Sequence, residues 1–138
     1  MLTTDIDLRV EDLMTIDPVT VSADATVEQA EDLLRRNRIS GLPVVDAAGR
    51  LVGVISQTDL LYLAVPSVQA LIRHRTSGIR GGEVMSSPPV TIDGELPIRE
   101  AARVMDRGRL HRLVAVDATG RPIGVLSAMD FVTLVAEG

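Results

Sequence analysis

The stretch Met14–Leu63, MTIDPVTVSADATVEQAEDLLRRNRISGLPVVDAAGRLVGVISQTDLLYL, has a similar second copy later in this chain of 138 residues. It aligns with Met85–Leu134 without a gap, at a constant offset of about 71 positions, and roughly 18 of about 50 pairs are identical. The run Pro18-Val19-Thr20, for example, recurs as Pro89-Val90-Thr91. Agreement in register over this length predicts two copies of one structural unit.

Each copy reads as strand, helix, strand, strand, helix. Short β-branched runs that follow a proline, 19–21 and 90–92, predict the first strand. Apolar residues spaced three and four apart then predict a helix with one apolar face: Val27, Ala30, Leu33 and Leu34 in the first copy, and Ile98, Ala101, Ala102 and Met105 in the second. Pro97 suits an early position of the second of these helices.

A hairpin follows in each copy. Residues 42–45 and 51–55 flank Asp46-Ala47-Ala48-Gly49, whose glycine can supply the left-handed residue of a tight turn. Residues 113–116 and 123–126 repeat the pattern around Gly120. The first strand, the helix and the second strand form a right-handed crossover unit.

These elements predict an α/β (α+β) fold of two β-α-β-β-α repeats related by pseudo-two-fold symmetry. We place repeat 1 at residues 8–65, a linker at 66–82 and repeat 2 at 83–136. Within the linker, 68–72 suggests a helical turn, and Arg73-His74-Arg75 is either an anion site or a solvated basic segment. Each repeat alone buries little apolar surface, so we expect the two to pack together.

Composition excludes several classes of function. There is no cysteine, which rules out disulfides and thiolate chemistry, and His74 and His111 have no metal-ligand spacing. A net charge of −5 and two aromatic residues disfavour a nucleic-acid surface. No apolar run approaches the length of a membrane span and the N-terminus does not resemble a signal peptide, so we expect a soluble, cytoplasmic protein without a membrane partner.

Ser56-Gln57-Thr58-Asp59 stands where the last strand of the first copy meets the last helix, and Ser127-Ala128-Met129-Asp130 repeats it. A serine with an acid three residues later resembles a helix capping box, which needs no ligand. Alternatively, the helix start can attract phosphate, and the carboxylate can accept both hydrogens of a ribose diol. Both interpretations remain open from the residues alone.

Together these marks resemble the tandem cystathionine-β-synthase (CBS) domain pair, also called a Bateman module, over residues 10–134. They include Leu13-Met14-Thr15, Val84-Met85-Ser86 and Gly41-Leu42-Pro43-Val44-Val45-Asp46. The resemblance implies a stand-alone regulatory module that binds AMP, ADP, ATP or S-adenosylmethionine in two clefts and has no prosthetic group. It also implies a homodimer and an effector protein that senses occupancy.

The resemblance further implies which residues form each cleft. One ligand site combines Met14, Val19, Ser40 and Gly41 with Ser127 and Asp130. The other combines Met85, Val90, His111 and Arg112 with Ser56, Thr58 and Asp59. Backbone groups at the valines would meet adenine, and the His-Arg pair would reach phosphate, because arginine can grip phosphate with two parallel hydrogen bonds.

Two other functions, an enzyme and a structural module, are alternatives to a regulatory ligand-binding module. An enzyme is disfavoured because the carboxylates are dispersed and no nucleophile and base stand together, so we predict no catalytic residues and no metal site. A structural dimerisation module with empty clefts would keep the same fold without ligand binding. The presence of both Asp59 and Asp130 argues for the regulatory module over this alternative.

Overall fold

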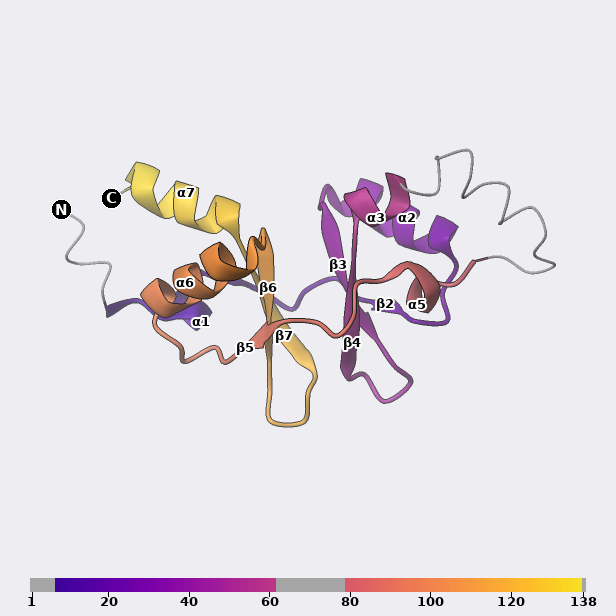
Figure 1. The fold of residues 1–138 in the computed structure, drawn as a ribbon, viewed down its shortest axis with the longest axis horizontal. Coiled ribbons are helices and arrows are strands. Elements are labelled where there is room, and N and C mark those ends of the chain that lie inside the picture. The colour runs from indigo at the N-terminus through magenta and orange to yellow at the C-terminus, as the bar shows by residue number, and fades with distance from the viewer. Residues whose placement is uncertain (1–6, 62–78, 138) are drawn as a thin grey trace. The chain divides into compact units, whose positions relative to one another are not determined.

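The computed structural model describes residues 7–61 and 79–137, drawn in colour in Figure 1. Contacts divide the chain into two compact units. Unit 1 joins the residues up to Pro18 with those from Val90 onward, and unit 2 runs from Val19 to Pro89. The predicted linker turn and the Arg73-His74-Arg75 cluster lie outside the described residues.

Unit 2 follows the predicted order of elements. Its elements are β2 (Val21–Ser22), α2 (Val27–Asn37), β3 (Gly41–Val45), β4 (Leu51–Ser56), α3 (Gln57–Leu61) and α5 (Gly81–Val84). The sheet has the order β2-β3-β4, with β2 parallel to β3 and β3 antiparallel to β4. The first strand begins two residues later than predicted, because the ladder to β3 starts with the pair Val21 and Val44.

Unit 1 repeats this order and adds a strand. Its elements are α1 (Val10–Leu13), β1 (Thr15–Ile16), β5 (Thr91–Ile92), α6 (Ile98–Gly108), β6 (Arg112–Val116), β7 (Pro122–Ser127) and α7 (Ala128–Glu137). The sheet order is β1-β7-β6-β5. Pro97 is the N-cap residue of α6, one position before the helix starts, where its missing N–H costs nothing.

The N-terminal part of each repeat, its lead-in segment, docks on the other repeat, which the sequence did not predict. Thr15 and Ile16 pair antiparallel with Val125 and Gly124 of β7. In the same way, Ser86 bridges Val54 of β4, with hydrogen bonds of 2.9 and 3.1 Å. Each compact unit is therefore built from one repeat plus the lead-in of the other.

Both predicted hairpin turns are present. Gly49 and Gly120 have φ angles of 84° and 86°, the left-handed region that glycine adopts without strain. Asp46 Oδ1 accepts hydrogen bonds from the backbone N–H groups of Ala48 and Arg50, both at 2.9 Å. Asp117 repeats this arrangement in unit 1. The turn is thus fixed by an aspartate as well as by the glycine.

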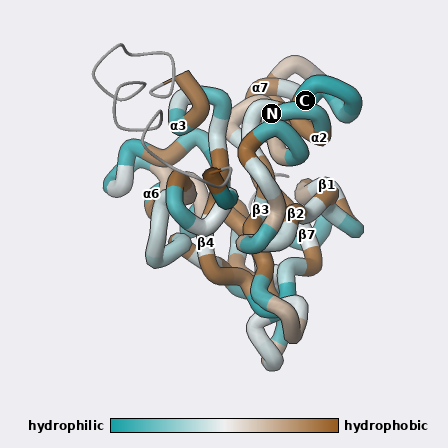
Figure 2. Tube along the Cα trace, turned by 90° about the vertical axis from the view of Figure 1, so that its right-hand side faces the viewer, coloured by the Kyte–Doolittle hydropathy of each residue, from teal (hydrophilic) through white to brown (hydrophobic). Residues whose placement is uncertain are grey.

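Each unit has its own aliphatic core. In unit 2, Leu42, Val44 and Ile55 are fully buried beneath α2. In unit 1, Leu113, Ala115 and Leu126 are buried to within 1% of complete exclusion from solvent, beneath α6. Figure 2 shows the hydrophobic character of β4. None of the described helices is long and apolar enough to cross a membrane.

Candidate functional site

The two Ser-x-x-Asp turns have nearly the same geometry. Ser56 N donates to Asp59 Oδ2 at 2.7 Å, Ser56 Oγ lies 3.1 Å from the same oxygen, and Asp59 N donates back to Ser56 Oγ at 3.3 Å. Ser127 N donates to Asp130 Oδ2 at 2.7 Å, with Oγ at 3.2 Å. The capping box that the spacing suggests is therefore formed in full at Ser56, and at Ser127 the half in which the carboxylate accepts from the serine N–H is formed.

The cap leaves part of each carboxylate available. In both turns the serine binds Oδ2, and among the described residues no hydrogen bond reaches Oδ1 of Asp59 or Asp130. Both aspartates are half-buried, so the free oxygen is held in place by the cap but is not sealed from a ligand. Capping and ribose recognition are thus compatible in one carboxylate. Thr58, on the first turn of α3, is exposed.

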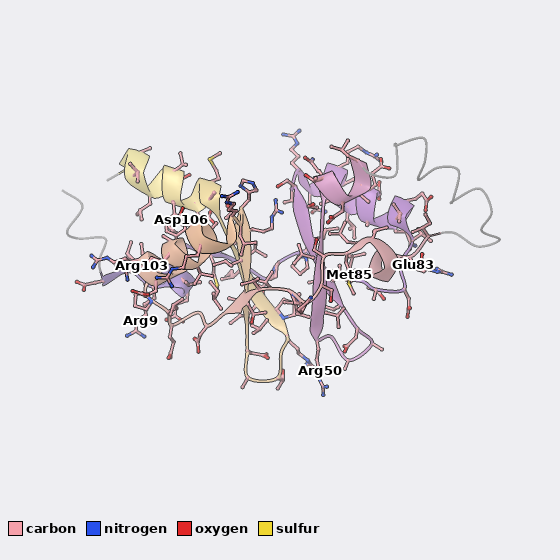
Figure 3. All side chains as sticks on the ribbon, in the orientation of Figure 1. Arg9, Arg50, Glu83, Met85, Arg103 and Asp106 are labelled. Atoms are coloured by element: carbon pink, nitrogen blue, oxygen red, sulfur yellow. The ribbon has the colours of Figure 1, made fainter. Side chains whose placement is uncertain are left out.

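Met14 and Met85 each pack against a glycine, in the space that a side chain at that glycine would fill. A Cβ on Gly124 would overlap Met14 Sδ, and a Cβ on Gly53 would overlap Met85 Sδ. Figure 3 shows Met85 beside β4, the strand that leads to Ser56. The structure therefore brings Met14 into one unit with Ser127 and Asp130, and Met85 into the other unit with Ser56, Thr58 and Asp59.

The divergent dipeptides lie at the start of the central strands. Arg112 pairs in register with Ser127, and Ala128 N donates to the His111 carbonyl at 2.9 Å. In unit 2, Gly41 pairs with Ser56, and Gln57 N donates to the Ser40 carbonyl at 3.0 Å. Each dipeptide is therefore tied through the backbone to the Ser-x-x-Asp turn of its own unit.

The valines assigned to adenine precede their strands. Val19 is half-buried and packs on the core of unit 2, whereas Val90 of unit 1 is 46% exposed. The groups assigned to one ligand divide between the units: Val19, Ser40 and Gly41 belong to unit 2, and their partners Met14, Ser127 and Asp130 belong to unit 1. The structure gathers the methionine, serine and aspartate of each set within one unit.

The sequence did not predict the hollow that lies beside His111. Its volume is about 390 Å³, and α6 and α7 form its walls. It is lined by Ala102, Met105, Asp106, Arg109, Leu110, His111, Ala128 and Phe131. Arg109 has a φ of 52°, a left-handed C-cap position, as has Arg38 at the end of α2 with a φ of 54°.

Two repeated α/β units, each with a capped carboxylate and a methionine seated on glycine, define a tandem-repeat module. The family model described as "CBS domain" matches residues 10–65 and 82–137. The chain therefore belongs to the CBS domain family, with two copies of the domain, as the repeats predicted.

The similar proteins include a much longer enzyme and proteins of about the same extent as this chain. Inosine-5′-monophosphate dehydrogenase of Mycobacterium tuberculosis is 36% identical over 125 residues, which cover 90% of this chain and 22% of the dehydrogenase. This chain thus spans less than a quarter of that curated relative. CBSX2 of Arabidopsis thaliana, solved in complex with AMP, is 34% identical with a TM-score of 0.81, covering 94% of this chain and 96% of CBSX2.

The CBS domain pair of the protein MJ0100, solved with 5′-methylthioadenosine and S-adenosyl-L-methionine, has a TM-score of 0.82. The match covers 94% of this chain and 97% of the other, at 22% identity, so the likeness concerns the fold.

Proposed function

We propose that this chain is a regulatory module that binds an adenosine-containing ligand: AMP, ADP, ATP or S-adenosylmethionine. The observation that carries the proposal is the pair of carboxylates, Asp59 and Asp130, each held by its cap through Oδ2 with Oδ1 open. An oriented carboxylate oxygen accepts the hydrogens of a ribose diol without further ordering of the side chain. The AMP complex of the similar CBSX2 supports this class of ligand.

The other groups complete the proposal. His111 is exposed and, with the Arg112 guanidinium, offers hydrogen-bond donors to phosphate, whereas Ser40 and Gly41 offer a hydroxyl and close backbone approach. The resemblance to the family assigns Asp59 to the same ligand as His111 and Arg112. We retain that grouping, and the complementary grouping of Asp130 with Ser40 and Gly41, as predictions. The chain itself would carry out no catalysis, and an effector protein would respond to the bound state.

Thermal unfolding with a panel of the four ligands tests the function. A ligand at about 100 times its dissociation constant adds roughly 2.7 kcal/mol to the free energy of unfolding, or several degrees in Tm. Guanosine nucleotides at equal concentration control for general anion effects. Flat melting curves at millimolar concentration would instead favour the structural dimerisation module, for which the bond from the serine N–H to the aspartate in both turns is the supporting observation.

Self-association is part of the same proposal. The outer face of α7 exposes Met129, Val132 and Val135, with exposed fractions between 58% and 66%, and Leu61 of α3 is 67% exposed. An apolar helix face of this kind is stabilised by burial against a second copy. Light scattering at micromolar concentration should report about twice the monomer mass. A monomer at high concentration would contradict the proposal.

A further inference from the structure

The methionines that the structure describes differ in how far they are exposed. The chain has no cysteine, so the thioether of methionine is the only sulfur group that an oxidant can modify. Met129 on α7 is 66% exposed, Met105 on α6 is 6% exposed, and Met14 and Met85 are half-buried. Because exposure governs how fast a thioether is oxidised, Met129 should react first, Met14 and Met85 next, and Met105 last.

Met14 and Met85 hold the same place in the two units. Met14 lies in the volume that a Cβ on Gly124 would fill, and this glycine is buried in β7. Met85 lies in the same way on Gly53, which is buried in β4. Each glycine stands three residues before the serine of a Ser-x-x-Asp turn. Both thioethers therefore pack on the strands that lead into the two carboxylate turns.

The backbone on both sides of each methionine is fixed. Met14 N donates to the Val10 carbonyl at 2.9 Å, and the next residue, Thr15, pairs with β7. Met85 N donates to the Gly81 carbonyl at 3.0 Å, and the residue after it bridges β4. A larger side chain at either position must therefore rotate off its glycine or break the contacts of the lead-in segment.

Oxidation of the sulfur makes this change with a single atom. The sulfur lone pair attacks one oxygen of hydrogen peroxide, the O–O bond breaks and an S–O bond forms. The sulfur gives up two electrons, and the second peroxide oxygen leaves as water with both protons. The sulfoxide is polar and chiral where the thioether was apolar. Placing it against buried backbone costs free energy unless it finds a hydrogen-bond partner.

We propose that Met14 and Met85 are oxidation sites through which hydrogen peroxide weakens binding of the adenosine-containing ligand, an inference that rests on the proposed function. Each methionine belongs to one of the two sets of ligand residues, and each repeat carries its sulfur on an equivalent glycine. One oxidant therefore acts on both sets. Methionine sulfoxide reductases return the sulfoxide to the thioether, so the effect is reversible.

Peptide mass spectrometry after peroxide treatment tests whether the sites are accessible. Met129 should be oxidised fastest, Met14 and Met85 more slowly, and Met105 slowest. Saturating AMP should slow the oxidation of Met14 and Met85, because a ligand in contact with these side chains shields them, and should leave the rate at Met129 unchanged. Oxidation of Met14 and Met85 that is as slow as that of Met105 would overturn the inference.

Calorimetric titration of AMP measures the coupling to the ligand. Peroxide treatment should weaken AMP binding by about tenfold or more, which corresponds to roughly 1.4 kcal/mol, and treatment with both classes of sulfoxide reductase should restore it. Met14→Leu combined with Met85→Leu keeps the side chains apolar and removes the sulfur, so peroxide should not change the AMP affinity of this variant, whatever its starting value. Met129→Leu is the matched control and should lose affinity on oxidation as the wild type does.

The outcomes separate this inference from the proposed function. Unchanged AMP affinity in wild-type protein whose Met14 and Met85 are oxidised would overturn the inference alone, and so would a loss of affinity that persists in the double leucine variant. Untreated protein that binds no AMP would overturn the AMP-binding function and the coupling with it. If the double leucine variant does not fold, the wild-type loss and its reversal by the reductases decide the question.

Discussion

Units 1 and 2 hold their lead-in segments by the same backbone contacts but with different side chains. Val10 N donates to the Leu96 carbonyl at 2.9 Å, and Gly81 N, in the equivalent position, donates to the Ala25 carbonyl at 2.7 Å. The Val10 side chain is 0% exposed in the core of unit 1, whereas Gly81 contributes no side chain to unit 2. Backbone hydrogen bonds therefore define where the segment docks, and apolar burial adds to how strongly it is held.

The largest expected change in the free energy of unfolding comes from the side chain that is buried in unit 1 and absent from unit 2. Val10→Ala should lower the free energy of unfolding by about 2–3 kcal/mol, because it removes two buried methyl groups and leaves a cavity. Gly81→Ala should change it by less than about 1 kcal/mol, since the nearest atom to the added methyl, Ile55 Cδ1 at 3.0 Å, ends a flexible side chain, and the Ser22 and Ala25 carbonyl oxygens lie at ordinary contact distance, 3.5 and 3.7 Å. Urea unfolding measures both values. Equal losses for the two variants would show that the side chain at this position does not distinguish the units.

The next effect concerns the two carboxylates. Asp59→Ala and Asp130→Ala should each weaken binding of an adenosine ligand by about 1.5–3 kcal/mol, the range for a charge-assisted hydrogen bond. The loss of the cap should cost only about 1 kcal/mol of stability. Asp→Asn at the same positions keeps an acceptor for the serine N–H and serves as the control for the cap.

Calorimetric titration of AMP and ATP into these variants also separates the units. If Asp59 shares a ligand with His111 and Arg112, Asp59→Ala should cost more for ATP than for AMP, whereas Asp130→Ala should be less sensitive to phosphate number. Wild-type affinities in both variants, with only a loss of stability, would reduce the two turns to helix caps.

A smaller effect is expected at the glycines beneath the methionines. Gly124→Ala should cost about 1–2 kcal/mol, because the new methyl group displaces the Met14 side chain. Gly53→Ala should cost at least as much, because its methyl group would meet Met85 and also the Ser86 carbonyl oxygen, at 2.9 Å. Combining Gly124→Ala with Met14→Ala should cost less than the sum of the two single changes, which a double-mutant cycle would measure. Strict additivity would show that the contact is incidental.

The smallest expected effect concerns the pKa of the turn aspartate, which has a different neighbour in each hairpin. The Thr119 hydroxyl lies 2.6 Å from Asp117 Oδ1, and Ala48 provides no such group to Asp46. This hydroxyl, followed by the backbone N–H of Arg121, holds the pKa of Asp117 below its ordinary value. A depressed folded-state pKa contributes stability above the unfolded pKa of about 4, and that stability is lost as the pH falls through the folded value.

Thr119→Ala should therefore raise the pKa of Asp117 and reduce the acid sensitivity that this residue contributes. A carboxyl-detected NMR titration between about pH 2 and 6 would measure the change. An unchanged pKa would assign the effect to the backbone N–H groups alone.

Most of the local structure could be predicted from the sequence, because it depends on neighbours along the chain. The 3.6-residue periodicity predicted α2 and α6, and the Asp-x-x-Gly turns predicted both hairpins. Serine followed by aspartate at i+3 suggested a cap at Ser56 and Ser127, and in both turns the serine N–H donates to the aspartate. Strand ends were less accurate, since β2 starts where β3 offers a partner and not where β-branched residues begin.

By itself, the sequence determined the two repeats, their elements and the residues that could hold a ligand, since period, turn chemistry and duplication are written in neighbouring residues. Only the tertiary structure decided that Thr15 and Ile16 complete the sheet of the second repeat. A two-residue strand has no sequence signal for its partner. The open edge of β7 and the burial of Val10 against Ile92 and Leu113 make that pairing favourable, and both exist only after the chain has folded.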